Sequence, residues 1–281
     1  MGEQIITTII RSNETKTLRI IEPFYDPKLH GIDWKGLKAD YARFLPHISN
    51  NYDFQELLSE LLGELNASHT GGRYSPQAQN PDATATLGLL YDEKHTGTGI
   101  KVTEVLEGGP FNKAISKLKP GMIIEKIDGE TITDDIDWAK LLNRKATKNT
   151  LISILDPASN TRFEETIKPI TFGEESALMY KRWLKKMDEM VTKLSGGKVG
   201  YVHVQGMNDG SYRNTFDAVM GKNFDKEALI VDTRFNGGGW LHDDLATFLS
   251  GKRYLDFAPQ GNKLKDGEPM GRWSKPSVMI T

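Results

Sequence analysis

Three short apolar runs in the last third of the chain alternate with helix-type patterns, and this alternation most constrains the fold. The runs are residues 199–204, 228–232 and 277–281, and helical spacing of apolar residues fills 211–220 and 241–249. Apolar strands separated by helices are typical of parallel strands joined by right-handed crossovers. The sequence therefore predicts an α/β domain in residues 173–281. This domain begins with a helical pattern from Glu174 to Leu194.

Residues 83–172 have a different pattern of short strands. We expect strands at 83–90, 99–106, 122–127, 151–155 and 163–170, a short helix starting at Pro110, and another helix capped by Asp134. Asp128-Gly129 is the strongest short hairpin signal in the chain. Many short strands with two small helices predict a compact, partly open β-barrel. The chain as a whole is thus predicted to be multidomain, with an α+β part and an α/β part.

Residues 23–82 are predicted to form a helical domain that follows a leader or remnant of an upstream region at 1–22. An apolar stripe recurs at steps of three and four from Phe54 to Leu65. Asp53 is the expected N-cap, with Glu56 reaching back, and Gly71-Gly72 is the expected stop. A helix of that length would carry Ser68 and His69 out of its end on the apolar side.

The charge and composition of the 281 residues exclude several classes of function. The net charge of −2 offers no field of one sign for nucleic acid or an anionic membrane, and no apolar run approaches the ~20 residues that span a bilayer. Cysteine is absent, so disulfides and thiolate metal sites are excluded. His30, His47, His95, His203 and His242 lack the helical spacing of a zinc site. We predict no metal and no cofactor, and most of these histidines are expected to be solvated or structural.

Asn236-Gly237-Gly238-Gly239 lies between a predicted parallel strand and a predicted helix. Free amides at such a place favour developing negative charge, and glycines let a backbone approach a ligand closely. The string fits an oxyanion hole, and it also fits a plain βα turn. It is not a phosphate loop, because no Lys-Ser or Lys-Thr follows, and not a dinucleotide fingerprint, because His242 stands where glycine is needed.

Ser68-His69 is the second candidate site. A histidine serves as a general base near neutral pH, and a preceding hydroxyl can orient its ring. The alternative interpretation is a core histidine that closes a helix. Asp243-Asp244 is expected to serve the start of a helix, and Arg234 to form a structural ion pair with Asp232.

Two other patterns have both a functional and a structural interpretation. Leu87-Gly88-Leu89 lies in an extended stretch whose amides can receive a peptide C-terminal carboxylate, or it belongs to an ordinary small domain. The methionine and tryptophan stripe from Met179 to Leu194 is predicted to be core and not a cofactor box.

Three stretches together resemble the tricorn branch of the tail-specific (C-terminal processing) serine peptidases. They are Phe-Tyr-Asp-Pro-Lys-Leu-His-Gly-Ile-Asp-Trp at 24–34, Gly-Glu-Leu-Asn-Ala-Ser-His-Thr at 63–70, and Asp-Thr-Arg-Phe-Asn-Gly-Gly-Gly at 232–239. The resemblance covers the chain from about Pro23 to its end. It implies a helical domain at 23–82, a PDZ-like domain at 83–172, and an incomplete domain of the caseinolytic-protease (ClpP) and crotonase type at 173–281.

By this resemblance His69 is the general base, and Ser68 completes its charge relay. An amide near Gly238, in the turn that includes Gly237 and Gly239, is the oxyanion donor. The nucleophilic serine is expected after a strand like 277–281, and a glutamate later still. Two β-propellers would precede Met1. The chain is therefore expected to be a fragment cut before its nucleophile and inactive alone.

The function expected from the resemblance is proteolysis of peptides or unfolded protein by a serine peptidase. The alternative is a non-catalytic PDZ-type scaffold that binds peptides. The resemblance implies a cytoplasmic location, with a periplasmic one left open, and the apolar edge of an incomplete sheet predicts a homo-oligomer. No nucleic-acid partner and no membrane span are expected.

Overall fold

The computed structural model describes residues 6–11, 14–19, 24–26, 28–68, 70–76, 79–262 and 267–281. The chain divides into two compact units, residues 1–81 and 82–281.

The first unit contains a β-hairpin and two helices. Strands β1 (Ile6–Arg11) and β2 (Glu14–Arg19) pair antiparallel, and helices α1 (Trp34–Ala42) and α2 (Asn51–Gly63) follow. The predicted helical region thus contains two helices. Two short 3-10 turns, η1 (Leu29–Gly31) and η2 (Leu45–His47), precede α1 and α2 respectively.

Both ends of α2 differ from the prediction. The side chain of Asn50, and not that of Asp53, caps the helix by accepting hydrogen bonds from the amides of Tyr52 and Asp53. The helix ends at Gly63, well before Gly71-Gly72, and Asn66 has a left-handed φ of 47°. Asparagine tolerates this conformation well enough to end a helix, and so the chain turns away before it reaches Ser68.

The first part of the second unit is an antiparallel sheet, which we call the β3–β8 sheet. Its strand order is β3-β4-β5-β7-β8, and β6 pairs with β5. The strands are β3 (Leu89–Tyr91), β4 (Ile100–Val105), β5 (Ile123–Ile127), β6 (Glu130–Thr131), β7 (Thr150–Asp156) and β8 (Thr161–Ile167). The predicted Asp128-Gly129 hairpin is confirmed, because Ile127 pairs with Glu130 and both turn residues have positive φ.

The predictions of two helices beside this sheet are both wrong, for different reasons. Residues 110–118 form turns and no helix, and Ile115 in this segment is 86% exposed. The second predicted helix is a short 3-10 helix, η3 (Trp138–Leu142), and it follows Asp137 and not the expected cap Asp134. One face of the sheet closes over a buried core that includes Leu87, Leu89 and Ile152.

Helix α3 (Phe172–Leu194) connects the β3–β8 sheet to the rest of the unit. Thr171 and Glu174 form a capping box at its start, which fixes where the helix begins. The stripe predicted to be core is instead largely open: Met190 is 51% exposed, Leu194 is 81% exposed, and no residue of α3 is buried. Arg182 of α3 pairs with Glu104 of β4, and Lys185 of α3 pairs with Glu107 in the loop after β4.

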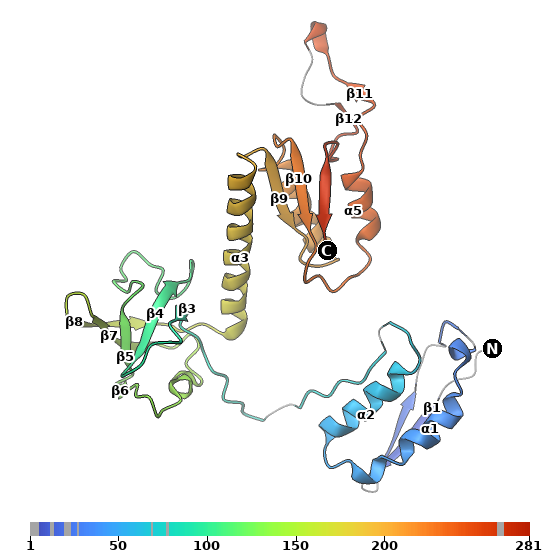
Figure 1. Ribbon diagram of the computed structural model, residues 1–281, viewed down its shortest axis with the longest axis horizontal. Coiled ribbons are helices and arrows are strands. Elements are labelled where there is room, and N and C mark those ends of the chain that lie inside the picture. The colour runs from blue at the N-terminus through green and yellow to red at the C-terminus, as the bar shows by residue number, and fades with distance from the viewer. Residues whose placement is uncertain are drawn as a thin grey trace. The chain divides into compact units, whose positions relative to one another are not determined.

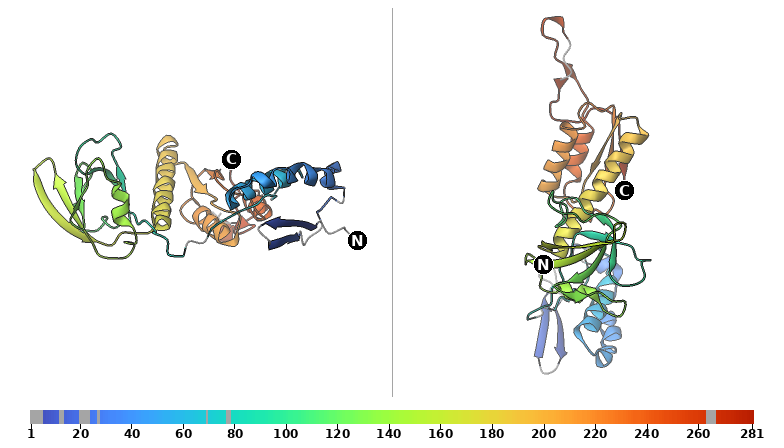
Figure 2. Two further views of the ribbon diagram at one scale, coloured as in Figure 1. Left: turned by 90° about the horizontal axis from the view of Figure 1, so that it is seen from below. Right: turned by 90° about the vertical axis from the view of Figure 1, so that its left-hand side faces the viewer.

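The predicted strand–helix alternation is confirmed in the last third of the chain. Strands β9 (Val199–His203), β10 (Ala228–Asp232) and β13 (Ser277–Ile280) form a parallel sheet in the order β13-β10-β9. Helices α4 (Asp209–Met220) and α5 (His242–Leu249) connect them, followed by a small hairpin of β11 (Leu255–Asp256) and β12 (Gly267–Glu268) with the 3-10 turn η4 (Pro259–Gly261). This hairpin extends away from the parallel sheet (Figures 1 and 2).

The two helices lie on the same face of the parallel sheet because both crossovers step in the same direction across it. Right-handed connections from β9 to β10 and from β10 to β13 leave the sheet on the same side. Val219 of α4 and Phe248 of α5 accordingly share one buried core with Val202 and Val231 of the strands. Helix α3 lies on the other side (Figure 1) and contacts β9.

The open edge of β9 is covered by one buried side chain. Asn223, in the loop after α4, is 1% exposed and donates to the carbonyl oxygens of Tyr201 (3.3 Å) and Ala218 (3.0 Å). A Cβ on Gly200 would lie 2.5 Å from the Asn223 side-chain oxygen, so glycine is needed for this close approach. The first of these bonds satisfies the carbonyl of Tyr201, a backbone group that an edge strand otherwise leaves unpaired.

Within the part of the chain that the structure describes, no helix is both long enough and apolar enough to cross a membrane.

We expect Asn223→Leu to destabilise the second unit. The substitution keeps the branched shape of the side chain but leaves the buried carbonyl oxygen of Tyr201 without this donor, at a cost of about 1–3 kcal/mol. The carbonyl of Ala218 still accepts from the backbone amide of residue 223. Denaturation followed by tryptophan fluorescence measures the change. Asn214→Ala, an exposed asparagine on α4, is the matched control and should stay within about 0.5 kcal/mol of wild type. Equal stability of the two variants would contradict the capping role.

Candidate active site

The carboxyl ends of β9, β10 and β13 meet at one edge of the parallel sheet, where α/β folds generally place their ligands. The loop that leaves β10 is tied to both neighbours. Thr233 donates through its amide (2.8 Å) and its hydroxyl (3.1 Å) to the carbonyl of Ile280 at the end of β13. On the other side, Asn236 Nδ2 donates to the carbonyl of Val204, just past β9, at 2.9 Å.

A buried carboxylate fixes the direction in which this loop leaves the sheet. Asp232 ends β10 and is fully buried. It accepts hydrogen bonds from the backbone amide, Nε and Nη2 of Arg234, the shortest at 2.6 Å from Nη2. It accepts another from the Tyr201 hydroxyl at 2.7 Å. A buried charge is stable only when it is paired and hydrogen-bonded. The expected structural ion pair between Arg234 and Asp232 is therefore present.

These partners shift the ionisation of the whole cluster. The Arg234 guanidinium is the main cause that lowers the pKa of Asp232 to about 2, and the Tyr201 hydroxyl adds to the effect, against the opposing influence of burial. Burial, and then the hydrogen bond to Asp232, raises the pKa of Tyr201. Asp232 is thus charged and Tyr201 neutral across the physiological range.

Two of the three candidate glycines adopt the positive φ that glycine permits. Gly238 and Gly239 have positive φ of 83° and 144°, and Gly237 does not. Gly239 lies against Met207, so that an added Cβ would be 2.6 Å from Met207 Cβ and 2.9 Å from its carbonyl oxygen. Residues 237–240 are exposed, and α5 begins two residues further on with Asp243 and Asp244 in its first turn.

One detail of the turn was not predicted. The amide of Gly238, the expected oxyanion donor, donates to Asn236 Oδ1 at 2.8 Å. Asn236 therefore uses its carboxamide oxygen on the turn and its carboxamide nitrogen on Val204, which makes it the residue that shapes the glycine segment.

In the first unit, described residues on both sides of the expected catalytic histidine are held by hydrogen bonds. His69 itself lies outside the described residues, and Ser68 is exposed. His30 Nδ1 is 2.9 Å from the carbonyl oxygen of Leu65, which is 2% exposed, and must donate to it. Past the histidine, the Ser59 hydroxyl bonds both the amide and the carbonyl of Gly72. Ser68 and the glycine turn belong to different units, so their meeting stays a prediction.

The Leu87-Gly88-Leu89 stretch is placed by packing. Leu87 and Leu89 are 0% and 2% exposed and belong to the core of the β3–β8 sheet. Gly88 has a φ of 64°, its carbonyl accepts from the Leu106 amide, and an added Cβ would lie 2.8 Å from Pro110 Cδ. The side chains of Leu87 and Leu89 are therefore not available to a ligand.

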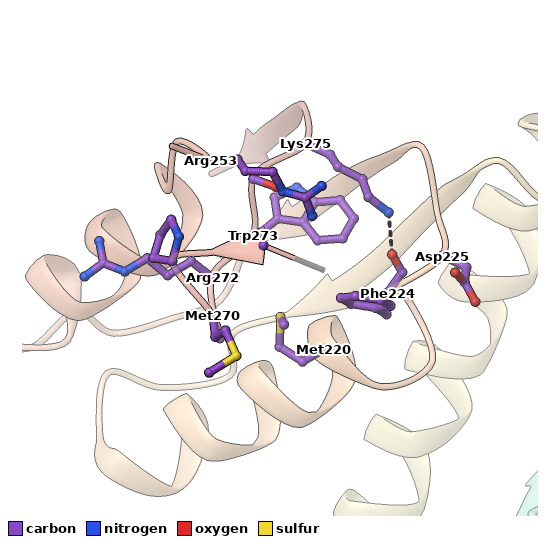
Figure 3. Close-up of a pocket in the computed structure, with 12 residues that line it drawn as sticks. Met220, Phe224, Asp225, Arg253, Met270, Arg272, Trp273 and Lys275 are labelled. Atoms are coloured by element: carbon purple, nitrogen blue, oxygen red, sulfur yellow. Dashed lines mark hydrogen bonds between the residues drawn. The ribbon is translucent and has the colours of Figure 1, made fainter. Parts of the chain in front are cut away.

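A cavity of about 600 Å³ lies elsewhere in the second unit, between the end of α4 and the segment before β13 (Figure 3). Met220, Phe224 and Trp273 supply apolar walls, and Arg253 and Lys275 lie at the rim (Figure 3). The Lys275 ammonium donates to the carbonyls of Phe224 and Lys226 and so closes the loop beneath it. No group of three or more histidine, aspartate or glutamate side chains among the described residues could hold a metal ion.

The sequence did not reveal the roles of His203, Tyr201 and Asn236. His203 Nε2 lies 2.8 Å from the carbonyl oxygen of Arg234, and its Nδ1 lies 2.7 Å from the Tyr180 hydroxyl. The available signal was the alternation of polar Tyr201 and His203 along an otherwise apolar strand. Such residues share one face, and here that face looks toward α3.

Comparison with known proteins gives two family matches along the chain. Residues 18–63 match the Tricorn protease C1 domain, and residues 198–281 match Peptidase family S41. The chain is 27% identical over 258 residues to a tricorn protease homolog of Saccharolobus solfataricus, covering 88% of this chain and 23% of that protein. It is 30% identical to a putative tricorn protease homolog 2 of Streptomyces coelicolor, covering 78% of this chain and 19% of that protein.

A solved structure of the tricorn protease has a similar fold, with a TM-score of 0.69 at 22% identity over 88% of this chain and 24% of that one. The chain thus spans about a fifth to a quarter of the length of these proteins.

We expect Asp232→Asn to destabilise the second unit in a pH-dependent manner. The pKa of Asp232 is lower in the folded state (about 2) than its ordinary value of 3.8, so its ionised form stabilises the fold above about pH 4. The loss in the variant should be about 2 kcal/mol near neutral pH and should shrink as the pH falls from 4 toward 2. Urea denaturation across that range measures it. The control is Asp209→Asn, which breaks an exposed ion pair with Arg213 and should cost less than about 1 kcal/mol. A stability difference between wild type and Asp232→Asn that does not change with pH would refute the stabilising role of the Asp232 charge.

The three glycines should tolerate alanine very differently. At Gly237 an added Cβ would point into open space and φ is not positive, so we expect Gly237→Ala to change the free energy of unfolding by less than about 0.5 kcal/mol. Gly238→Ala also meets open space but must adopt positive φ, at about 1 kcal/mol. Gly239→Ala adds a collision with the Met207 backbone and should cost more than about 2 kcal/mol. Melting temperatures of the three variants give this order, and any other order would contradict the described turn.

Proposed function

The chain is a tricorn-like member of peptidase family S41, and from that premise we propose that it is part of a serine peptidase that hydrolyses peptides or unfolded protein. The observation that carries the proposal is the glycine turn at the carboxyl edge of the parallel sheet. It is fixed by hydrogen bonds at residues 232–236 and exposed at 237–240. A rigid, exposed turn of amides is what stabilisation of a tetrahedral oxyanion requires.

The proposed chemistry is acyl transfer through a serine. The serine oxygen attacks the scissile carbonyl while the His69 imidazole takes the hydroxyl proton, and Ser68 completes the relay that orients His69. The carbonyl oxygen becomes an oxyanion that the turn amides stabilise. Collapse expels the amine, which takes the proton back from His69, and water releases the acyl group by the same steps.

The three glycines of the turn differ in what their surroundings leave available to an oxyanion. Gly237 and Gly239 are exposed, and the Gly238 amide already has a partner in Asn236. An oxyanion would have to compete with that carboxamide for Gly238, so we propose that Asn236 holds the turn ready and yields the amide when substrate binds. The nucleophilic serine is proposed to follow a strand like β13, at the same edge of the sheet.

The remaining finer assignments belong to the same proposal. We propose that residues 83–172 form a PDZ-like domain whose Gly88 backbone receives a peptide C-terminus, and that residues 173–281 are of the ClpP/crotonase type. We also propose self-association through β13, where Val278 and Met279 are 65% and 52% exposed.

The test is covalent labelling of the protein that carries this chain together with the residues that its reading frame encodes after Thr281. A fluorophosphonate probe should form an adduct on a serine downstream of β13, and His69→Ala should slow labelling by at least ~100-fold, because the general base is lost. His47→Ala, a histidine in the turn η2, is the matched control and should label at the wild-type rate. The absence of a serine adduct, or labelling that His69→Ala leaves unchanged, would refute the mechanism.

A further inference from the structure

The loop after β10 contains a strained residue that its surroundings must hold in place. Phe235 has a left-handed φ of 64° and its side chain is 88% exposed. A bulky side chain in this conformation is uncommon and costs about 1–3 kcal/mol. Burial of its ring does not compensate for that cost, so hydrogen bonds in the neighbouring backbone must do so.

His203 makes the hydrogen bond that is best placed for this. Its Nε2 lies 2.8 Å from the carbonyl oxygen of Arg234, which is the residue immediately before Phe235. A carbonyl oxygen only accepts, so Nε2 carries the proton and donates it. Because a peptide group is planar, fixing the Arg234 carbonyl also fixes the amide of Phe235. The imidazole thus sets the plane from which the chain enters the glycine segment.

The other ring nitrogen of His203 is oriented by α3. Nδ1 lies 2.7 Å from the Tyr180 hydroxyl, and with the proton on Nε2 it accepts from that hydroxyl. The Trp183 ring stands edge-on to the imidazole, with ring centres 4.8 Å apart and planes at 85°, and also contacts Phe235 at 6.1 Å. These contacts hold the imidazole in one orientation and one tautomer.

We propose that His203 is a positioning residue: by holding the Arg234 carbonyl, it fixes the Phe235 backbone and thereby aims the amides of residues 237–239 at the reacting carbonyl. The proposal rests on the oxyanion role proposed for that turn. His203 itself touches no reacting atom. Helix α3, through Tyr180 and Trp183, becomes part of the support of the site although it lies on the opposite face of the sheet from α4 and α5.

Two substitutions separate the hydrogen bond from the volume of the ring. His203→Phe keeps a ring against Trp183 but cannot donate to the Arg234 carbonyl. His203→Gln loses the ring but carries an N–H near the position of Nε2 and should restore the bond. Val219→Ala is the control for general loss of stability, because it opens a cavity in the core on the other face of the same sheet.

The first measurement is made on the 281-residue chain, labelled with ¹⁵N-glycine. In His203→Phe we expect shifted amide signals for Gly237, Gly238 and Gly239 and hydrogen exchange at least ~10-fold faster at these residues. His203→Gln should leave both near wild type, and so should Val219→Ala. Unchanged glycine signals in His203→Phe, or equal changes in Val219→Ala, would overturn the proposal whatever the enzyme does.

The second measurement is made on the longer protein used for covalent labelling. His203→Phe should lower kcat by ~10-fold to ~100-fold with little change in KM, since misplacement by about 1 Å is enough for such a loss, and His203→Gln should recover most of it. A loosened turn with unchanged kcat would overturn the positioning role. A wild-type protein that neither labels nor cleaves peptides would instead refute the proposed function, while the glycine signals would still decide whether His203 holds the turn.

Discussion

The carboxylate of Asp232 is the constraint on which the peptidase-like part of this molecule depends. It stands at the end of the central strand, fully buried, and is ionised there because Arg234 and Tyr201 both donate to it. An unpaired charge in that place would cost several kcal/mol. The side chain of Arg234 must therefore fold back onto its own strand. That requirement bends the chain away from the sheet at one defined residue and sets the direction in which the loop leaves β10.

The rest of the loop is shaped by its neighbours across the sheet and not by its own residues alone. Thr233 is held by Ile280 of β13, and Asn236 is held by Val204 beyond β9, so the loop is tied to both strands that flank β10. Parallel strands in register bring these three chain segments to one edge. The position of the glycine amides is consequently a property of the assembled sheet, which is why residues far apart in the sequence determine it.

How much the sequence could reveal follows the same division between local and distant causes. The alternating strands and helices, the Asp128-Gly129 hairpin and the Asp232–Arg234 pair were predictable, because each is set by residues close together in the chain. The end of α2 was not, because the apolar stripe runs on to Leu65 whereas the helix ends at Gly63 and Asn66 takes a left-handed conformation. The exposed face of α3 was misjudged, since the periodicity of a helix shows that one face is apolar but not what covers it. In the candidate site, the glycines were found by type, whereas the partner of the Gly238 amide depends on Asn236 being held from β9.

His30 and His203, one in each unit, play the same kind of structural role. His30 donates to the carbonyl of Leu65 and His203 faces the carbonyl of Arg234, each just before a segment with candidate chemistry. In both cases the hydrogen bond is made to a carbonyl oxygen of the loop and not to one of its amides. The amides stay available for a ligand, while the planar peptide groups transmit the restraint to the next residue. A site that works through backbone N–H groups needs supports of this kind, and a neutral imidazole supplies one donor for the carbonyl and one acceptor by which a tyrosine can orient it, as Tyr25 does for His30 and Tyr180 for His203.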